Sequence, residues 1–449
     1  MDHIVTWITA FAFFFTLLLI YWRPKGLNEA IPATIGAMIV IFCGTVSMEN
    51  LLDISSKVSG AALTIISTLI MALVLESVGV FHWVAAHISE KAKGSGIRLF
   101  CYTNLLCFFM TIFFNNDGSI IITTPILLLI VSRFQLKKHQ KLPYLISGAL
   151  IATASSAPIG VSNIVNLIAL KIINMDLYMH TAMMFIPSMI GLLFLFGMLL
   201  VVFYKDIPKS LPPATMSIHY DRFSHPLKTT SAWKLNNINA RQIKWVLVFV
   251  FLVRISIFIA SYFEIPEVTV AIAGSVILLG WRWYYAKTKP YDVLLKAPWH
   301  ILVFATGMYV VIYGLNNIGF SDYLIRQLSP YIGKDLFPSI FVMGSAVSIL
   351  SNVFNNHPAL MIGTMALTNL NVDPIMLKAA YLASIIGSDI GSLLLPIGTL
   401  ATLLWMHILK KHHEKVSWAD YMKITFVVIP PTVFVTLFVL YYWMMLFFI

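Results

Sequence analysis

Two short polar motifs interrupt long apolar stretches of this chain at corresponding places. The first, FFNNDGSIIITTPI, covers residues 113–126, and the second, VFNNHPALMIGTMA, covers residues 353–366. Their asparagine pairs, Asn115-Asn116 and Asn355-Asn356, lie 240 positions apart. An amide side chain offers both a donor and an acceptor, and it is costly in hydrocarbon when it is unpaired. The repeated motif therefore indicates a polar site inside a membrane.

A second kind of interruption follows each motif. Pro158-Ile159-Gly160 lies downstream of the first asparagine pair, and Pro396-Ile397-Gly398 lies downstream of the second. Proline removes a helix hydrogen bond and glycine permits a bend, so each triplet predicts a helix that unwinds near the middle of the bilayer. Paired, interrupted hydrophobic segments in two halves of a chain are the best sequence pointer to the binding site of a transporter.

The polar residues around these four breaks are the candidate solute-binding residues. They are Asn115, Asn116, Gly118, Ser155, Ser156, Ser162, Asn163 and Asn166 in the first half, and Asn355, Asn356, Ser388, Gly398, Thr399 and Thr402 in the second. Each of them could instead be a helix cap or make an interhelical hydrogen bond.

Three titratable residues at the breaks are candidates for proton coupling: Asp117, His357 and Asp389. A carboxylate at this depth is costly unless it is solvated, paired or protonated, which favours a role in proton transfer for the two aspartates. His357 occupies the position in the second motif that Asp117 has in the first. It could titrate near neutral pH or donate to a carbonyl, and the sequence favours neither.

The composition requires a membrane-embedded chain. Hydrophobic residues make up 59% of the 449 residues and charged residues only 11%, whereas about a quarter of a soluble domain is charged. The formal charge of +11 comes from lysines and arginines in short clusters between apolar blocks, where they set orientation, so we expect no nucleic-acid partner. The three cysteines predict neither a disulfide framework nor a metal site, and the absence of HExxH and P-loop motifs predicts a chain that is not an enzyme and needs no cofactor.

The apolar blocks divide the chain into two halves. We expect an N-terminal membrane repeat over residues 1–204, a cytoplasmic linker over 205–242, and a C-terminal membrane repeat over 243–449, with six apolar blocks in each repeat. The fourth block of each repeat, 97–133 and 337–368, is too long for one helix across a hydrocarbon core of about 30 Å. Each is therefore predicted to fold back as a re-entrant hairpin with its asparagine pair at the tip.

Positive charge predicts the orientation of the hairpins. Basic residues lie on both sides of the first one, namely Lys91, Lys93, Arg98, Arg133, Lys137, Lys138 and Lys141. Both of its ends are therefore expected in the cytoplasm, whereas the balanced flanks of the second suit the outer face. Each repeat then has five transmembrane helices plus a hairpin, so the chain is predicted to be an all-α polytopic membrane protein of two inverted repeats, with both termini outside. Broken full-length helices in place of the hairpins would instead give parallel repeats.

The motifs NNDGSIIITTPI, SNIVNLIAL, NNHPALMIG and IGSDIGSLLLPIGTLATLLWMHIL resemble the arsenical pump membrane protein family of the ion transporter superfamily, over almost the whole chain. The resemblance implies an inner-membrane permease that exports arsenite and antimonite, driven by protons or by a soluble arsenite-stimulated ATPase. It also implies an elevator-like core that moves against a scaffold. One departure is Ser392-Leu393, where many members have a Pro-Lys pair.

Trivalent arsenic is a neutral trihydroxide at neutral pH, which suits a site of amides and hydroxyls. We therefore expect a secondary transporter that extrudes trivalent metalloid hydroxides in exchange for protons. The alternative is a sodium/proton or organic-anion transporter of the same superfamily. Asp117 and Asp389 favour a cation, whereas an anion would require an additional basic residue in the site. Arg254, in the middle of the seventh apolar block, could pair with a carboxylate or shape the pathway.

Overall fold

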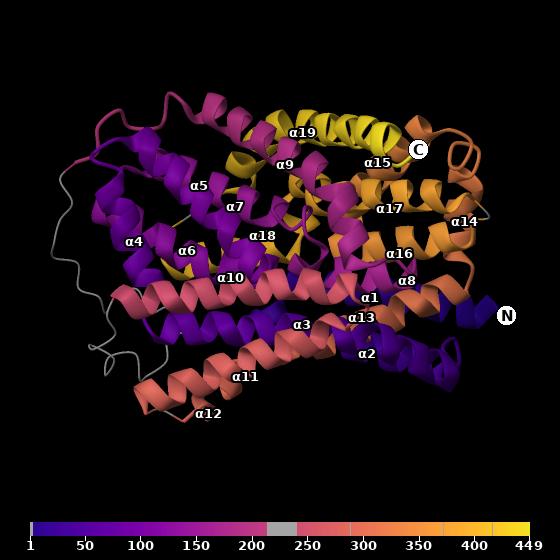
Figure 1. Cartoon of the computed structure of the whole chain (residues 1–449). Coiled ribbons are helices and arrows are strands. Elements are labelled where there is room, and N and C mark those ends of the chain that lie inside the picture. Colours follow the sequence, from indigo (N-terminus) through magenta and orange to yellow (C-terminus); the bar gives the residue numbers. More distant parts are fainter. Residues whose placement is uncertain (1–2, 213–239, 288, 371, 415) are drawn as a thin grey trace.

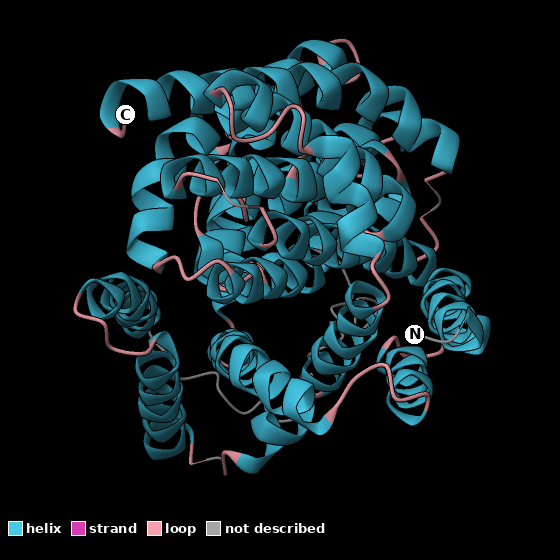
Figure 2. Ribbon diagram, turned by 90° about the vertical axis from the view of Figure 1, so that its right-hand side faces the viewer, coloured by secondary structure: helices cyan, strands magenta, loops and turns pink. Residues whose placement is uncertain are grey.

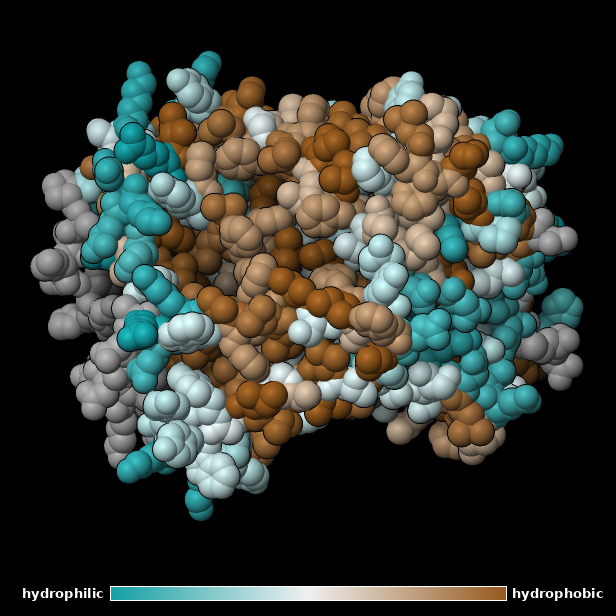
Figure 3. Space-filling model, in the orientation of Figure 1, coloured by the Kyte–Doolittle hydropathy of each residue, from teal (hydrophilic) through white to brown (hydrophobic). Residues whose placement is uncertain are grey.

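The computed structural model describes residues 3–212 and 240–449, apart from 288, 371 and 415. Most of the predicted linker, 205–242, lies outside these described residues. Within them the regular structure is entirely helical, and eleven helices are long and apolar enough to cross a membrane. Figure 3 shows apolar side chains gathered in a broad central band, with polar side chains at the two ends. The predicted all-α polytopic fold is confirmed.

Each helix of the first half has a counterpart in the second. The first half contains α1 (His3–Trp22), α2 (Ala30–Phe42), α3 (Met48–Ser77), α4 (Val80–Lys91), α5 (Gly96–Phe113), α6 (Asn116–Arg133), α7 (Lys138–Ala154), α8 (Ile164–Ile172) and α9 (Leu177–Phe203). The second half contains α10 (Ala240–Tyr262), α11 (Glu267–Ala286), α12 (Tyr291–Lys296), α13 (His300–Asn317), α14 (Phe320–Leu328), α15 (Leu336–Phe354), α16 (Asn356–Thr368), α17 (Pro374–Asp389), α18 (Leu400–Lys411) and α19 (Trp418–Phe447). Together, α12 and α13 correspond to α3.

The duplication extends to helix ends and to packing. Gly79 and Gly319, 240 positions apart, precede α4 and α14 with φ of 78° and 88°, a left-handed conformation that favours glycine. Helix α6 packs on α18 while α8 packs on α16. These two contacts change places when the halves are exchanged, as expected for related repeats.

The two predicted hairpins are present and enter from opposite ends of the molecule. The arms α5 and α6 pack on each other, as do α15 and α16. Figure 1 shows the α5–α6 pair in the left part of the molecule and the α15–α16 pair in the right part, with both chain termini on the right. The repeats are therefore inverted, and the alternative of parallel repeats is excluded.

The helices form two layers, which Figures 1 and 2 show from two directions. The scaffold layer contains α1–α3 and α10–α13, and the core layer contains the two hairpins, the broken helices, α9 and α19. The broken helices are α7 with α8 and α17 with α18, which unwind over residues 155–163 and 390–399 as predicted. Short 3-10 turns, η2 (Gly160–Ser162), η5 (Gly391–Leu394) and η6 (Pro396–Gly398), occupy these gaps.

Some helices differ from the apolar blocks that predicted them. Helix α3 begins at Met48, whereas the third apolar block predicted a span over residues 58–83. The helix starts earlier because the Ser47 hydroxyl accepts a hydrogen bond from the backbone N–H of Asn50 at 3.1 Å and caps a polar first turn. The helices α4 and α14 were not predicted, since with 12 and 9 residues they are too short to cross the bilayer.

The predicted orientation can be tested at the two ends of α9. In a variant without Cys43, Cys101 and Cys107, single cysteines replace the exposed residues Asp176 and Lys209. A membrane-impermeant maleimide is expected to label Asp176→Cys in intact cells and Lys209→Cys only in everted vesicles, because basic residues flank the linker. The opposite pattern would reverse the orientation, and labelling of both from one side would contradict a crossing by α9.

Candidate functional site

The first asparagine of each pair caps the second arm of its hairpin. Asn115 Oδ1 accepts a hydrogen bond from the backbone N–H of Gly118 at 2.6 Å, and Asn355 Oδ1 accepts one from the N–H of His357 at 3.4 Å. A Cβ atom on Gly118 would lie 2.5 Å from Asn115 Oδ1, so glycine leaves room for the cap. Asn115, Asn355 and Gly118 therefore have structural roles in keeping the hairpin tips folded.

The second asparagine of each pair is buried with polar atoms that have no protein partner. Asn116 is 3% exposed and Asn356 is 1% exposed. From the residues that the structure describes, Asn116 Oδ1 accepts no hydrogen bond, and neither Oδ1 nor Nδ2 of Asn356 has a partner. Buried polar groups of this kind are rare in proteins and usually contact a ligand or water. In each motif the first asparagine is thus a helix cap, and the second is a candidate solute-binding residue.

The other two breaks are capped in the same way. Asn163 Oδ1 accepts from the backbone N–H of Val165 at 3.3 Å at the start of α8. Thr399 Oγ1 accepts from the N–H of Thr402 at 3.0 Å at the start of α18, and the two threonine hydroxyls lie 2.8 Å apart. A capped helix N-terminus retains N–H groups and a partial positive charge that can meet a polar solute.

Two further candidate residues, Ser155 and Gly398, stabilise the backbone conformation at the breaks. The Ser155 hydroxyl donates to the carbonyl of Ile151 at 2.5 Å and ends α7. A Cβ atom on Gly398 would lie 1.8 Å from the carbonyl oxygen of Ser392, so only glycine fits there. Ser162 and Ser388 are fully buried beside the breaks, and Ser162 Oγ has no hydrogen-bond partner among residues 3–212 and 240–449, so far as these are described.

A cavity of about 810 Å³ meets the N-termini of all four capped helices. Its inner wall includes Asp117 of α6, Ile164 of α8, His357 of α16 and Leu400 of α18. Each of these is the first or second residue of its helix. The predicted convergence of two hairpins and two broken helices is therefore present, and Asp117 and His357 face the same space.

The mouth of the cavity is polar and lies between the scaffold layer and the core layer. It is lined by residues at the ends of α1, α2, α13 and α18, namely Arg23, Glu29, His300, His407, Lys410 and Lys411. Helix α1 runs from the end that holds both termini toward the other end (Figure 1), which is predicted to be cytoplasmic, so its last residues lie on the side of the mouth that is farther from the termini. The cavity opens toward that side.

The mouth of the cavity was not predicted from the sequence, where basic residues between the apolar blocks indicated only orientation. Arg23 Nη2 lies 2.5 Å from Glu29 Oε2, and His300 Nε2 lies 3.8 Å from Glu29 Oε1. The sequence signal for such a mouth is a charged residue within one turn after an apolar block, as at Arg23 and Lys410. This signal does not indicate which helix ends line the same opening.

Asp389 connects the two halves away from this cavity. It is fully buried, and its carboxylate accepts hydrogen bonds from Ser156 Oγ at 2.7 Å, Asn166 Nδ2 at 2.7 Å and Asn163 Nδ2 at 3.1 Å. Asp117, in contrast, lines the cavity, and its Oδ1 has no hydrogen-bond partner among the described residues. The two aspartates thus have different environments, one bonded within the protein and one facing the cavity.

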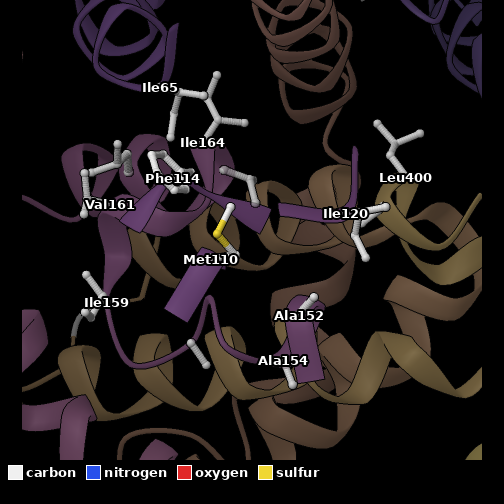
Figure 4. Close-up of a cluster of buried hydrophobic side chains, with 14 of the residues drawn as sticks. Ile65, Met110, Phe114, Ile120, Ala152, Ala154, Ile159, Val161, Ile164 and Leu400 are labelled. Carbon is white, nitrogen blue, oxygen red and sulfur yellow. The ribbon is translucent and has the colours of Figure 1, made fainter. Parts of the chain in front are cut away.

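Apolar side chains surround the polar breaks. Figure 4 shows Met110 of α5, Phe114, which follows α5, Ile120 of α6, Ile164 of α8 and Leu400 of α18 as members of one cluster of buried hydrophobic side chains. All five are buried. Because such a shell lowers the local dielectric constant, hydrogen bonds and helix-end charges inside it are stronger than in water.

Arg254 has a backbone partner. Its Nε donates to the carbonyl oxygen of Phe113 at 2.7 Å, so the guanidinium contacts the tip of the first hairpin rather than a carboxylate. The partner of Arg254, which the sequence could not name, is therefore a backbone carbonyl.

The fold and the polar cavity between its layers define a multi-pass membrane transporter. The model of the arsenical pump membrane protein family matches residues 8–444. The chain belongs to this family, whose members move arsenicals across the inner membrane of bacteria.

Relatives support this placement, and a solved structure supports the fold. The chain is 59% identical over 435 residues to a Bacillus subtilis (strain 168) protein named after the arsenical pump, covering 96% of this chain and 98% of that protein. It is 30% identical over 425 residues to an arsenical pump membrane protein of Escherichia coli, covering 95% and 96%. The Alcanivorax borkumensis YdaH transporter shares the fold, with a TM-score of 0.58 at 10% identity over 96% of this chain and 98% of that one.

The division of roles within each asparagine pair predicts different effects on stability. Asn115→Ala removes a cap and is expected to lower the free energy of unfolding by about 1 kcal/mol. Asn116→Ala removes no protein hydrogen bond to Oδ1, so stability is expected to stay equal or rise. Thermal unfolding of the purified variants in detergent measures both. A larger loss for Asn116→Ala than for Asn115→Ala would contradict these assignments.

Proposed function

We propose that this chain exports the trivalent hydroxides of arsenic and antimony from the cytoplasm in exchange for protons. The observation that carries the proposal is the cavity on which the N-termini of α6, α8, α16 and α18 converge, with Asp117 and His357 at its inner end. The family membership supports transport of an arsenical, and the geometry supports a small polar solute.

The chemistry of the inner wall suits a neutral trihydroxide. Hydroxyl groups both donate and accept, and they can pair with helix N–H groups and with the Asp117 carboxylate. Asn116 and Asn356 precede the lining residues Asp117 and His357 in the chain but do not line the cavity themselves. The described residues that line the cavity include no cysteine. Binding through reversible hydrogen bonds permits release on the other side, whereas a thiolate bond to arsenic would slow it.

Exchange with protons follows if solute and proton compete for Asp117. On the cytoplasmic side, where protons are scarce, the aspartate loses its proton and its carboxylate accepts a hydrogen bond from the solute hydroxyl. On the outer side, protonation removes that acceptor and favours release. Asp389 accepts hydrogen bonds from Ser156, Asn163 and Asn166 and so links the two halves. A change in the charge of Asp389 would change these hydrogen bonds, and with them the packing of the core layer, in the same step.

A second candidate is the transport of an organic anion. It is favoured by one observation, the basic mouth formed by Arg23, Lys410 and Lys411, which would attract an anion at long range. A sodium/proton exchange also remains a candidate because two aspartates lie at the breaks. A soluble ATPase that energises the permease is a separate proposal about the energy source.

Everted membrane vesicles test the leading proposal. Arsenite is expected to accumulate in ATP-free vesicles only while their interior is acidic. Asp117→Asn and Asp389→Asn are each expected to reduce this accumulation to near background with normal membrane insertion, because neither can exchange a proton. Normal uphill transport by both variants would remove the aspartates from the coupling.

The same vesicles distinguish the alternatives. Sodium-dependent proton flux without arsenite flux would favour the sodium/proton exchanger, and uptake of a labelled carboxylate would favour the organic-anion transporter. Arsenite accumulation that requires ATP and an added soluble fraction would indicate an ATPase partner.

A further inference from the structure

Arg254 of α10 connects the scaffold layer to the tip of the first hairpin. Its side chain is buried, at 3% exposed, and Nε donates to the carbonyl of Phe113 at 2.7 Å. Phe113 is the last residue of α5 and lies two positions before the cap residue Asn115. The contact therefore acts at the turn that places Asn116 and Asp117.

The contact suits the chemistry of a helix C-terminus. The last carbonyls of a helix have no intrahelical donor and carry a partial negative charge, which a cation stabilises. The next carbonyl, that of Phe114, accepts from Thr68 Oγ1 of α3 at 2.9 Å. Two donors from the scaffold layer thus hold the two carbonyls where the first hairpin turns.

The inverted repeat provides a matched comparison at the second hairpin. Tyr21 OH of α1 donates to the carbonyl of Val353 at 3.1 Å, and Val353 lies 240 positions after Phe113. Helix α1 is the counterpart of α10. The same carbonyl is thus held from the scaffold in both halves, by a buried cation in one half and by a neutral, partly exposed hydroxyl in the other.

The charge has a cost that the contact alone does not explain. Within the described part of the chain, Nη1 and Nη2 of Arg254 have no hydrogen-bond partner, and a charged side chain within a membrane-spanning helix is expensive. A neutral donor would satisfy one carbonyl equally well, as Tyr21 does. The difference between the halves therefore favours a role for Arg254 beyond filling a hydrogen bond.

We propose that Arg254 is a positioning residue for transport. It holds the tip of the first hairpin, and with it Asn116 and Asp117, against the scaffold layer in the conformation whose cavity opens toward the linker side. The bond crosses between the two layers, so it must break when the core layer moves. The proposal deepens the proposed function by assigning a residue to the inward-open state, but this assignment does not depend on which solute is carried.

A cysteine in the cavity reports this state without any solute. In a variant lacking the native cysteines, Leu404→Cys on α18 lines the cavity and is labelled with a maleimide in everted vesicles. Arg254→Gln is expected to slow labelling by about threefold or more, because loss of a charge-assisted hydrogen bond shifts the population away from the inward-open state. Arg254→Lys, which keeps a charged donor, is expected to stay closer to the parent rate.

Three controls separate positioning from general stability. Tyr21→Phe removes the equivalent contact at the second hairpin and is expected to change labelling less than Arg254→Gln. Lys209→Cys, outside the cavity, should label equally in all backgrounds. Thr68→Val removes the neighbouring donor and should slow labelling in the same direction as Arg254→Gln, which tests the proposal if Arg254→Gln does not fold.

Transport kinetics give a second readout. In the arsenite assay, Arg254→Gln is expected to raise KM for arsenite, since a smaller fraction of the protein is inward-open while the solute contacts stay the same. If Leu404→Cys is labelled at the parent rate in Arg254→Gln, the proposal is overturned even if arsenite transport is normal. If Arg254→Gln does not fold, labelling at the parent rate in Thr68→Val overturns it instead. Absence of arsenite transport in the parent with slowed labelling in Arg254→Gln would instead overturn only the proposed function.

Discussion

The structure depends on one constraint, namely that a helix interrupted inside hydrocarbon must have its free backbone groups satisfied. Four helices of this chain begin at such an interruption, and each has a polar residue at its first turn: Asn115, Asn163, Asn355 and Thr399. Because these side chains cap the helix starts, the breaks can persist without water. The remaining N–H groups and helix-end charges are then available where the four starts meet.

Duplication of one fold unit brings the four starts together, and differences between the copies give the site its chemistry. The crosswise packing of α6 on α18 and of α8 on α16 follows from the inverted arrangement. Asp117 has His357 as its counterpart, and the Arg254 contact has the Tyr21 contact as its counterpart. A symmetric pair of acids or cations would leave the two orientations of the core equivalent. These differences make the surroundings of the first hairpin tip electrostatically different from those of the second.

Much of this arrangement could be predicted from the sequence, because the signals were local. The hairpins followed from apolar blocks too long for a single crossing, and the broken helices followed from Pro158 and Pro396. The division of roles between Asn115 and Asn116 could not be predicted, since both are asparagines one position apart and only the backbone turn decides which one reaches Gly118. The cavity mouth could not be predicted either, because it joins the ends of helices that are far apart in the sequence.

The departure from the family at Ser392-Leu393 has a simple structural setting. Both residues are fully buried, and the carbonyl of Leu393 accepts from the Tyr421 hydroxyl at 3.0 Å. Neither lines the cavity, so the missing cation does not remove a charge from its wall. Arsenical specificity is thus expected to come from the four helix starts and the residues beside them.

The most direct measurement is the position of the metalloid itself. Crystals of the protein soaked with antimonite give an anomalous signal from antimony, which locates the solute without assuming a mechanism. The account predicts a peak in the cavity within hydrogen-bonding reach of Asp117 and of the helix start that carries His357. A peak confined to a cysteine or to the outer surface, with none at the four helix starts, would contradict it.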